Sequence, residues 1–137
     1  MASVSFPSPE AAEIIEVDFV RLDGSTRSLK LLVDTGFTGK SSVIIGANDL
    51  DLIRAGLPAT ETTGALTGSQ NRAWVTCRIG AMEFQATMIA IVADVSALSL
   101  PIGLDGLVGL SFLRLFSRWG TRRTRKGWIF SIYDRAT

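Results

Sequence analysis

The sequence of 137 residues predicts one mainly-β, barrel-like domain with one or two short helices. Three observations favour this fold class. The chain contains many short runs in which apolar and polar residues alternate or β-branched residues gather. Turn signals such as Asp23-Gly24 and Gly80 separate these runs. Only two short stretches carry helix-capping signals. A chain of this length can bury a core without disulfides.

The first half of the chain is expected to hold a flexible arm, three strands and a short helix. The arm covers residues 1–12, whose start is rich in Ser and Pro, and a single domain then spans residues 13–137. A short helix is predicted over residues 48–55, with Asn48 as its N-cap. The predicted strands are 13–22, 29–33 and 42–45.

The second half is expected to consist of strands around a mobile hairpin tip. The segment 60–70 is rich in Thr and Gly, which is typical of such a tip. Ser111 is a potential cap for a helix that runs to about Phe116. The predicted strands are 74–79, 84–92, 107–109 and 128–133.

The side-chain inventory excludes most hydrolytic chemistries. The chain has no histidine, so Ser-His-Asp and Cys-His nucleophile pairs and histidine-ligated metals are ruled out. A lone Cys77 can form neither an internal disulfide nor a four-cysteine metal site, and we expect it to pack in the core. Carboxylate, lysine or tyrosine chemistry is what remains, and no metal or cofactor is expected.

Charge and hydropathy indicate a globular chain with a subunit interface. Apolar residues make up 47% and the mean hydropathy is +0.31, which is high for a small soluble chain. The net charge is +1, with an acidic first half and a basic second half. No uncharged apolar run nears 18 residues and no signal-peptide pattern opens the chain, so we expect a cytoplasmic protein that does not enter a membrane.

A basic cluster near the C-terminus allows two interpretations. Trp119 and Trp128 flank it, and together they are able to grip nucleic acid. The alternative is a solvated hairpin loop between two strands. We favour the loop, and regard nucleic-acid binding as unlikely, because nucleic-acid-binding domains usually carry a strongly basic overall charge. The cluster consists of Arg118, Arg122, Arg123, Arg125 and Lys126.

The stretch from Leu31 to Gly36 is the most informative part of the sequence. Three apolar residues deliver Asp34 into an apolar setting, on a turn made by Thr35 and Gly36. A carboxylate in such a setting is costly unless it is hydrogen-bonded or functional. Gly36 allows close backbone approach, so its N–H can face the carboxylate. An ordinary strand-end turn with an exposed aspartate is the alternative.

This stretch resembles the active-site signature of retropepsin-like aspartic proteases, in which two apolar residues precede Asp-Thr-Gly. A second family signature, two apolar residues and a glycine before a short helix, is matched by Leu107-Val108-Gly109. The Thr- and Gly-rich segment lies between the two, where the family places its flap hairpin. The resemblance covers roughly residues 13–134 and implies a closed β-barrel of the acid protease fold.

The sequence departs from the viral members of this family. Phe37 follows the triplet where Ala is commonest, and Thr38 and Leu110 replace an Asp and an Arg that pair in the viral enzymes. Both partners of that pair are absent together. Asp34 to Gly39 instead is similar to a bacterial-type branch of the family. The departures bear on substrate preference more than on the chemistry.

The resemblance implies an aspartic endopeptidase that works as a homodimer. Peptide hydrolysis of this type needs two carboxylates around one water, and the chain carries a single Asp-Thr-Gly. Asp34 of each subunit would then be catalytic, with Thr35 bonding across the two-fold axis and Gly36 donating to the carboxylates. The terminal strands would supply part of the interface. The expected substrate-contacting residues are Phe37 and Val108 in the cleft and Ala65, Leu66 and Gly68 in the flap.

One further alternative is a protein with the same fold but without catalytic activity. A retropepsin-like domain can serve as a non-catalytic peptide-binding or dimerisation module. The complete Asp34-Thr35-Gly36 triplet favours the enzyme.

Overall fold

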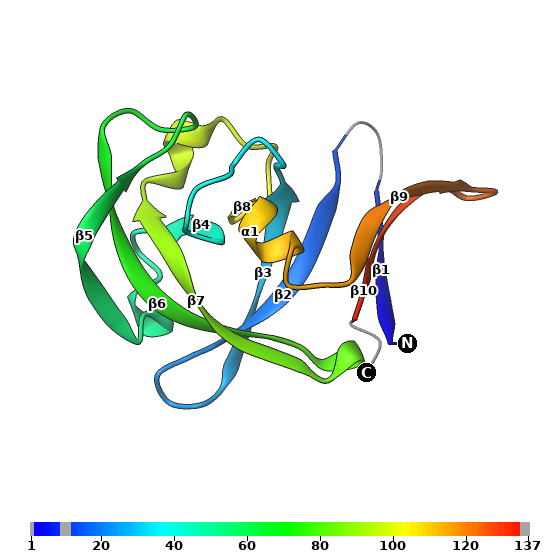
Figure 1. Ribbon diagram of the computed structural model, residues 1–137, viewed down its shortest axis with the longest axis horizontal. Coiled ribbons are helices and arrows are strands. Elements are labelled where there is room, and N and C mark those ends of the chain that lie inside the picture. Colours follow the sequence, from blue (N-terminus) through cyan, green and yellow to red (C-terminus); the bar gives the residue numbers. More distant parts are fainter. Residues whose placement is uncertain (1, 9–11, 135–137) are drawn as a thin grey trace.

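A seven-stranded sheet makes up most of the computed structural model, which describes residues 2–8 and 12–134 (Figure 1). β2 pairs with β3 on one side and with β6 on the other, so six strands close into a barrel and β5 lies outside against β6. The mainly-β barrel predicted from the sequence is confirmed. In spatial order the strands are β2 (Ile14–Val20), β3 (Thr26–Val33), β8 (Gly106–Val108), β4 (Val43–Gly46), β7 (Phe84–Ala93), β6 (Ser69–Ile79) and β5 (Ala55–Thr62).

Alternation along the strands fills the barrel interior. In β2, Ile15, Val17 and Phe19 are at most 1% exposed, whereas Glu16 between them faces solvent. The same core includes Phe112 of the short helix α1 (Leu110–Leu113). Close packing of these apolar side chains is the main source of stability of the barrel.

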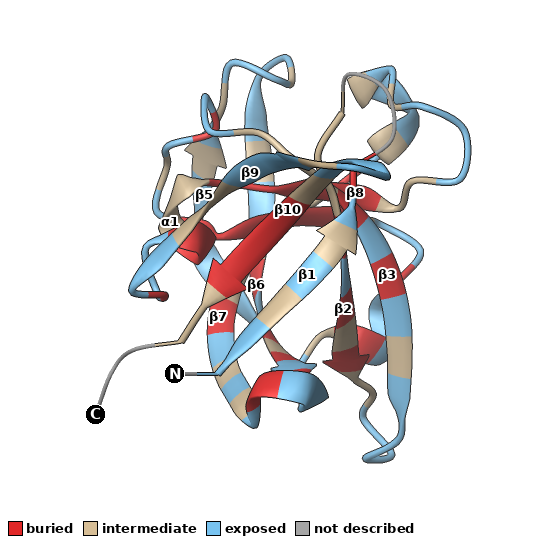
Figure 2. Cartoon of the chain, turned by 90° about the vertical axis from the view of Figure 1, so that its right-hand side faces the viewer, coloured by how far each residue is buried: buried red, intermediate tan, exposed pale blue. Residues whose placement is uncertain are grey.

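A second, three-stranded sheet joins the two ends of the chain. Its order is β1 (Ser3–Pro7), β10 (Gly127–Tyr133) and β9 (Arg118–Thr124), all antiparallel. β10 is the central strand, and its buried residues stand out in Figure 2. Phe130 and Ile132 of β10 reach into the barrel core, which fixes this sheet against the barrel.

The predicted flexible arm over residues 1–12 is wrong for residues 3–7. These residues form β1, and their backbone partners lie in β10 at the other end of the sequence. The side chains of Ser5 and Ser131, 126 residues apart, lie 2.8 Å from each other. Such a distant partner leaves no local signal. Residues 1 and 9–11 of the predicted arm lie outside the described residues.

The basic cluster is a hairpin loop only at Arg125 and Lys126, which form the turn between β9 and β10, whereas its three other residues belong to β9. Every residue of this strand pairs with β10. Trp119 faces the core side, with its ring 6.4 Å from that of Phe130, while Arg118, Arg122 and Arg123 are exposed. These arginines are therefore solvated, but they belong to a strand. The strand was not recognised from the sequence because two consecutive arginines hide its alternation of apolar and polar residues.

The two predicted helices differ in how far the structure supports them. Helix α1 follows Gly109, its N-cap, and ends before the predicted Phe116. The predicted helix over 48–55 is only a 3-10 turn, Leu50–Leu52, and Ala55 already begins β5, where it pairs with Trp74. Asp49 is the N-cap of this turn, but its carboxylate pairs with Arg27 at 2.6 Å instead of making a cap bond. Further 3-10 turns are Gly80–Met82 and Val95–Leu98. No helix in the described part of the chain is long and apolar enough to cross a membrane.

Candidate functional site

Asp34 directly follows β3, and the neighbouring strand β8 fixes its backbone. β3 and β8 run parallel, with Val33 opposite Val108, so their carboxyl ends meet at the same edge of the sheet. The Asp34 N–H donates a hydrogen bond to the carbonyl oxygen of Val108 at 2.9 Å. The apolar run before Asp34 therefore serves to anchor this residue at the end of a partly buried strand.

The Asp34 carboxylate is braced by its own turn. The Gly36 N–H donates to Oδ1 at 3.0 Å, and the Phe37 N–H donates to the Asp34 carbonyl oxygen at 3.1 Å. A Cβ at position 36 would lie 3.2 Å from Oδ1, so glycine permits this close approach. Asp34 is half-buried, and among the described residues no cation forms an ion pair with it.

The second motif packs directly behind this turn. The Leu110 N–H donates to the Phe37 carbonyl oxygen at 2.9 Å, and the Gly109 N–H donates to the Ser42 carbonyl oxygen at 2.9 Å. Any Cβ at position 109 would lie 2.6 Å from both the ring and the carbonyl oxygen of Phe37. The Ser111 hydroxyl adds a bond to the Gly39 carbonyl oxygen at 2.6 Å. The two motifs named from the sequence thus form one contiguous unit.

The tip of the β5–β6 hairpin faces the Asp34 turn across a small pocket. Strand β5 ends at Thr62 and β6 begins at Ser69, so the tip is residues 63–68. A pocket of about 230 Å³ separates the tip from the turn. Its lining residues are Asp34, Gly36 and Phe37 on the turn and Thr63, Gly64 and Ala65 on the tip.

An outer apolar cluster borders this pocket. Its buried members are Phe37, Ile44, Ile91, Ala93 and Leu107. Leu66 of the hairpin tip packs against this cluster. Phe37 is only 3% exposed yet lines the pocket, so it connects the cluster to the Asp34 turn.

The remaining residues named from the sequence have other surroundings. Thr35 is exposed at the turn. Gly68 adopts φ +80° and shapes the hairpin turn without lining the pocket. Val108 was expected in the cleft, but its side chain is 0% exposed in the barrel core. Val108 contributes its backbone carbonyl instead, because the side chain of a central strand residue points to one face only.

Four residues around the site were missed. Thr63 and Gly64 line the pocket beside Ala65, and their place in the predicted tip was the available signal. Glu61 and Ser41 meet next to the site, where the Ser41 hydroxyl donates to Glu61 Oε1 at 3.0 Å. No sequence pattern predicts that contact, because Ser and Glu are residue types that are common on solvated surfaces.

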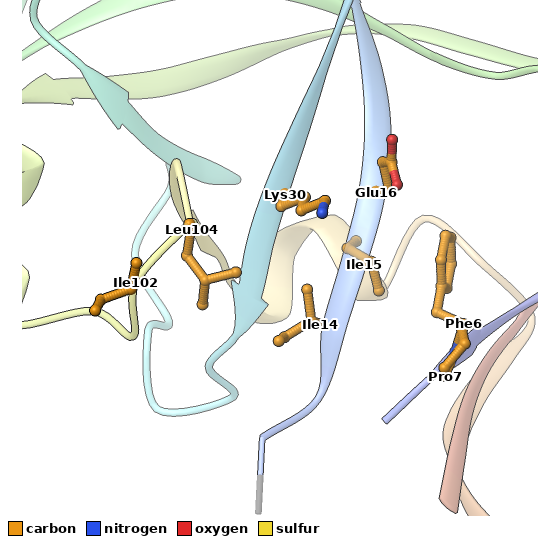
Figure 3. A pocket seen from close by; sticks show the side chains of 9 residues that line it. Phe6, Pro7, Ile14, Ile15, Glu16, Lys30, Ile102 and Leu104 are labelled. Atoms are coloured by element: carbon orange, nitrogen blue, oxygen red, sulfur yellow. The ribbon is translucent and has the colours of Figure 1, made fainter. Parts of the chain in front are cut away.

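A second pocket, the cysteine and the potential metal ligands of the chain do not add a reactive group to this site. A pocket of about 330 Å³ lies elsewhere, lined by side chains of β1, β2, β3 and the 102–104 loop (Figure 3). Burial raises the pKa of the Cys77 thiol to about 12, so this thiol is not a nucleophile at neutral pH. No group of three His, Cys, Asp or Glu side chains within residues 2–8 and 12–134 is arranged to hold a metal ion.

The arrangement supplies one braced carboxylate at the edge of a pocket beneath a hairpin tip. A carboxylate in this setting can exchange a proton with a bound water or polarise a carbonyl group. Comparison of the chain with protein-family models, with curated proteins and with solved structures gives no significant match.

Proposed function

We propose that this chain is one subunit of a homodimeric aspartic endopeptidase of the retropepsin-like type. The observation that carries the proposal is the setting of Asp34. Its carboxylate accepts the Gly36 N–H at 3.0 Å and borders a pocket closed on the other side by the hairpin tip. The packing of Gly109 against Phe37 supports the same assignment, because it unites both motifs of the resemblance.

The chemistry requires a second copy of the chain. Asp34 is the only acidic residue that lines the pocket in the described part of the chain. Two carboxylates that share one proton are needed to activate water and polarise the peptide carbonyl. Thr35 and Gly36 are exposed beside Asp34, so a partner subunit is able to approach there. A two-fold axis at this turn supplies the second Asp34.

In this dimer the two Asp34 carboxylates divide the work. The ionised carboxylate takes a proton from the water as its oxygen attacks the carbonyl carbon. The protonated one donates its proton to the carbonyl oxygen, and breakdown of the tetrahedral intermediate moves a proton to the leaving nitrogen. The Gly36 N–H bonds orient the carboxylates, and the tip residues 63–65 cover the peptide.

The substrate is a peptide with apolar side chains beside the scissile bond. Phe37 and Leu66 belong to the outer apolar cluster at the pocket, and burial of a matching side chain is favourable there. No cofactor takes part. With its single cysteine buried and no disulfide to form, the chain suits the cytoplasm.

A peptide-library digest across pH 4–7 tests this function. Wild type cleaves peptides best toward the acidic end, where one proton per carboxylate pair is present. Asp34→Asn abolishes cleavage and leaves folding intact. Asp23→Asn is the matched control, because Asp23 lies in an exposed turn before Ser25, and it keeps full activity.

Two results would redirect the assignment. A stable dimer that cleaves no peptide indicates a non-catalytic binding or dimerisation module. The exposed cations of β9 and its turn have no ion-pair partner among the described residues, which keeps nucleic acid as the second candidate partner. A salt-sensitive gel shift would reveal that activity.

A further inference from the structure

The contact of the hairpin tip with the surroundings of the Asp34 turn is apolar, because Leu66 packs against the outer apolar cluster. The backbone bonds of the tip are local, such as the Leu66 N–H donating to the Thr63 carbonyl oxygen at 3.3 Å. Across the pocket, no hydrogen bond joins residues 63–65 to residues 34–37 in the described structure. A polar contact that holds the hairpin near the turn must therefore come from residues outside 63–65.

Glu61, one residue before the end of β5, makes the polar contact that does this. Its Oε1 accepts the Ser41 hydroxyl at 3.0 Å, and its Oε2 lies 3.5 Å from the Ser41 backbone nitrogen. Ser41 is 0% exposed and the Glu61 side chain is 12% exposed. Gly39 leaves room for the carboxylate, because a Cβ there would collide with Glu61 Oε2.

Arg72 on the opposite strand compensates the charge of Glu61. Its Nη1 lies 3.6 Å from Glu61 Oε1, and its side chain is 13% exposed. The Arg72 Nε–H also donates to the Ala59 carbonyl oxygen at 3.1 Å. Removing a carboxylate from water costs less free energy when it is paired with a cation and hydrogen-bonded. Arg72 and Ser41 together therefore offset the cost of burying the Glu61 carboxylate.

Ser41 is a rigid anchor for this contact. The next residue, Ser42, donates its N–H to the Ile89 carbonyl oxygen at 2.8 Å and accepts the Gly109 N–H at 2.9 Å. Glu61 therefore ties the hairpin to the same frame that positions the Asp34 turn.

The hairpin also has a place at which it can bend. Pairing between β5 and β6 shifts register between Leu57 and Glu61, so the intervening residues leave the ladder. Such an interruption disrupts the ladder locally and bends the strand that carries it. The part of β5 beyond this bulge is the part that carries Glu61 and the tip.

We infer that Glu61, held by Ser41 and neutralised by Arg72, is a positioning residue that latches the hairpin tip over Asp34. The inference rests on the proposed function for its catalytic consequence. The latch holds the tip near the pocket, and the bulge before Glu61 allows the tip to lift when the Glu61–Ser41 contact breaks. Loss of the latch raises the population of lifted tips and weakens substrate binding.

Hydrogen exchange of backbone amides in residues 59–72 tests the latch without reference to catalysis. Glu61→Ala and Ser41→Ala should each speed exchange there by about tenfold, and the double variant should add little to either. Glu61→Gln keeps an acceptor for Ser41 and should lie between wild type and Glu61→Ala. Asp51→Asn, which breaks the exposed Arg21–Asp51 pair, is the matched control and leaves this exchange unchanged.

Peptide kinetics then test the consequence. Glu61→Ala should raise KM several-fold with a smaller change in kcat, and Glu61→Gln should restore part of the loss. If Glu61→Ala does not fold, Ser41→Ala and Glu61→Gln test the same contact, since each alters one partner of the network. Unchanged exchange at the tip in these variants overturns the latch even if the enzyme cleaves. If the wild type cleaves no peptide but the variants exchange faster at the tip, the proposed function is wrong and the latch is still supported.

Discussion

The backbone N–H of Asp34 donates to the carbonyl oxygen of Val108 at 2.9 Å, which joins the two halves of the candidate site. The bond connects the end of β3 to the end of β8, although these two residues are far apart in the sequence. Because β8 is buried and β3 is bonded along it, the position of the Asp34 turn depends on the barrel rather than on the loop. Its geometry should therefore resist changes at the surface and respond strongly to changes behind the turn.

Gly109→Ala is expected to destabilise the protein. The added Cβ would lie 2.6 Å from the Phe37 carbonyl oxygen, and backbone held by the Leu110 N–H cannot retreat without losing that bond. Overpacking of this kind costs about 1–3 kcal/mol in the free energy of unfolding. Urea unfolding measures it. Gly120→Ala is the control, because nothing lies within 4 Å of a Cβ there; equal stability of the two variants would contradict the packing described.

Leu66→Ala is expected to change peptide selectivity more than stability. Leu66 is only partly buried, and it packs against the outer apolar cluster beside the pocket. Removing it should lower kcat/KM for peptides with large apolar side chains by about tenfold and affect peptides with small ones less. Leu22→Ala, at a Leu 58% exposed in the β2–β3 turn, should leave both unchanged. An equal loss for all peptides would argue against a role in selectivity.

Cys77 should make stability depend on alkaline pH. Burial raises the pKa of its thiol from an ordinary value of 9.0 to about 12 in the folded protein. The unfolded thiol therefore ionises first, so the associated stability is complete below about pH 9 and is lost as the pH rises toward 12. Urea unfolding between pH 8 and 11 measures this, with Cys77→Ala expected to show the shallower decline. Parallel declines would contradict the burial of the thiol.

Solution mass should report a dimer under active conditions. The chain of 14.7 kDa is expected to sediment at twice that mass, because the proposed carboxylate pair needs two subunits. Sedimentation at the pH and concentration of the cleavage assay makes the measurement. An active monomer would contradict the shared pair.

Local features of the site were accessible to sequence analysis, and distant contacts were not. The bond from the Gly36 N–H to the Asp34 carboxylate spans two residues, so the residue types alone indicated it. Gly109 was named as part of the second signature of the resemblance, and the structure packs it against Phe37 of the Asp34 turn. Val108 was misassigned because the sequence does not show which face of a three-residue strand meets the core. β1 was missed because its partner β10 lies at the other end of the chain.

Mixed dimers of wild type and Asp34→Asn test the central claim most directly. Chains co-expressed in equal amounts and assembled at random should retain about one quarter of the wild-type cleavage rate per chain, because only dimers with two intact Asp34 carboxylates work. A rate of about one half would show that each subunit carries a complete and independent site, which contradicts a shared pair of Asp34 carboxylates.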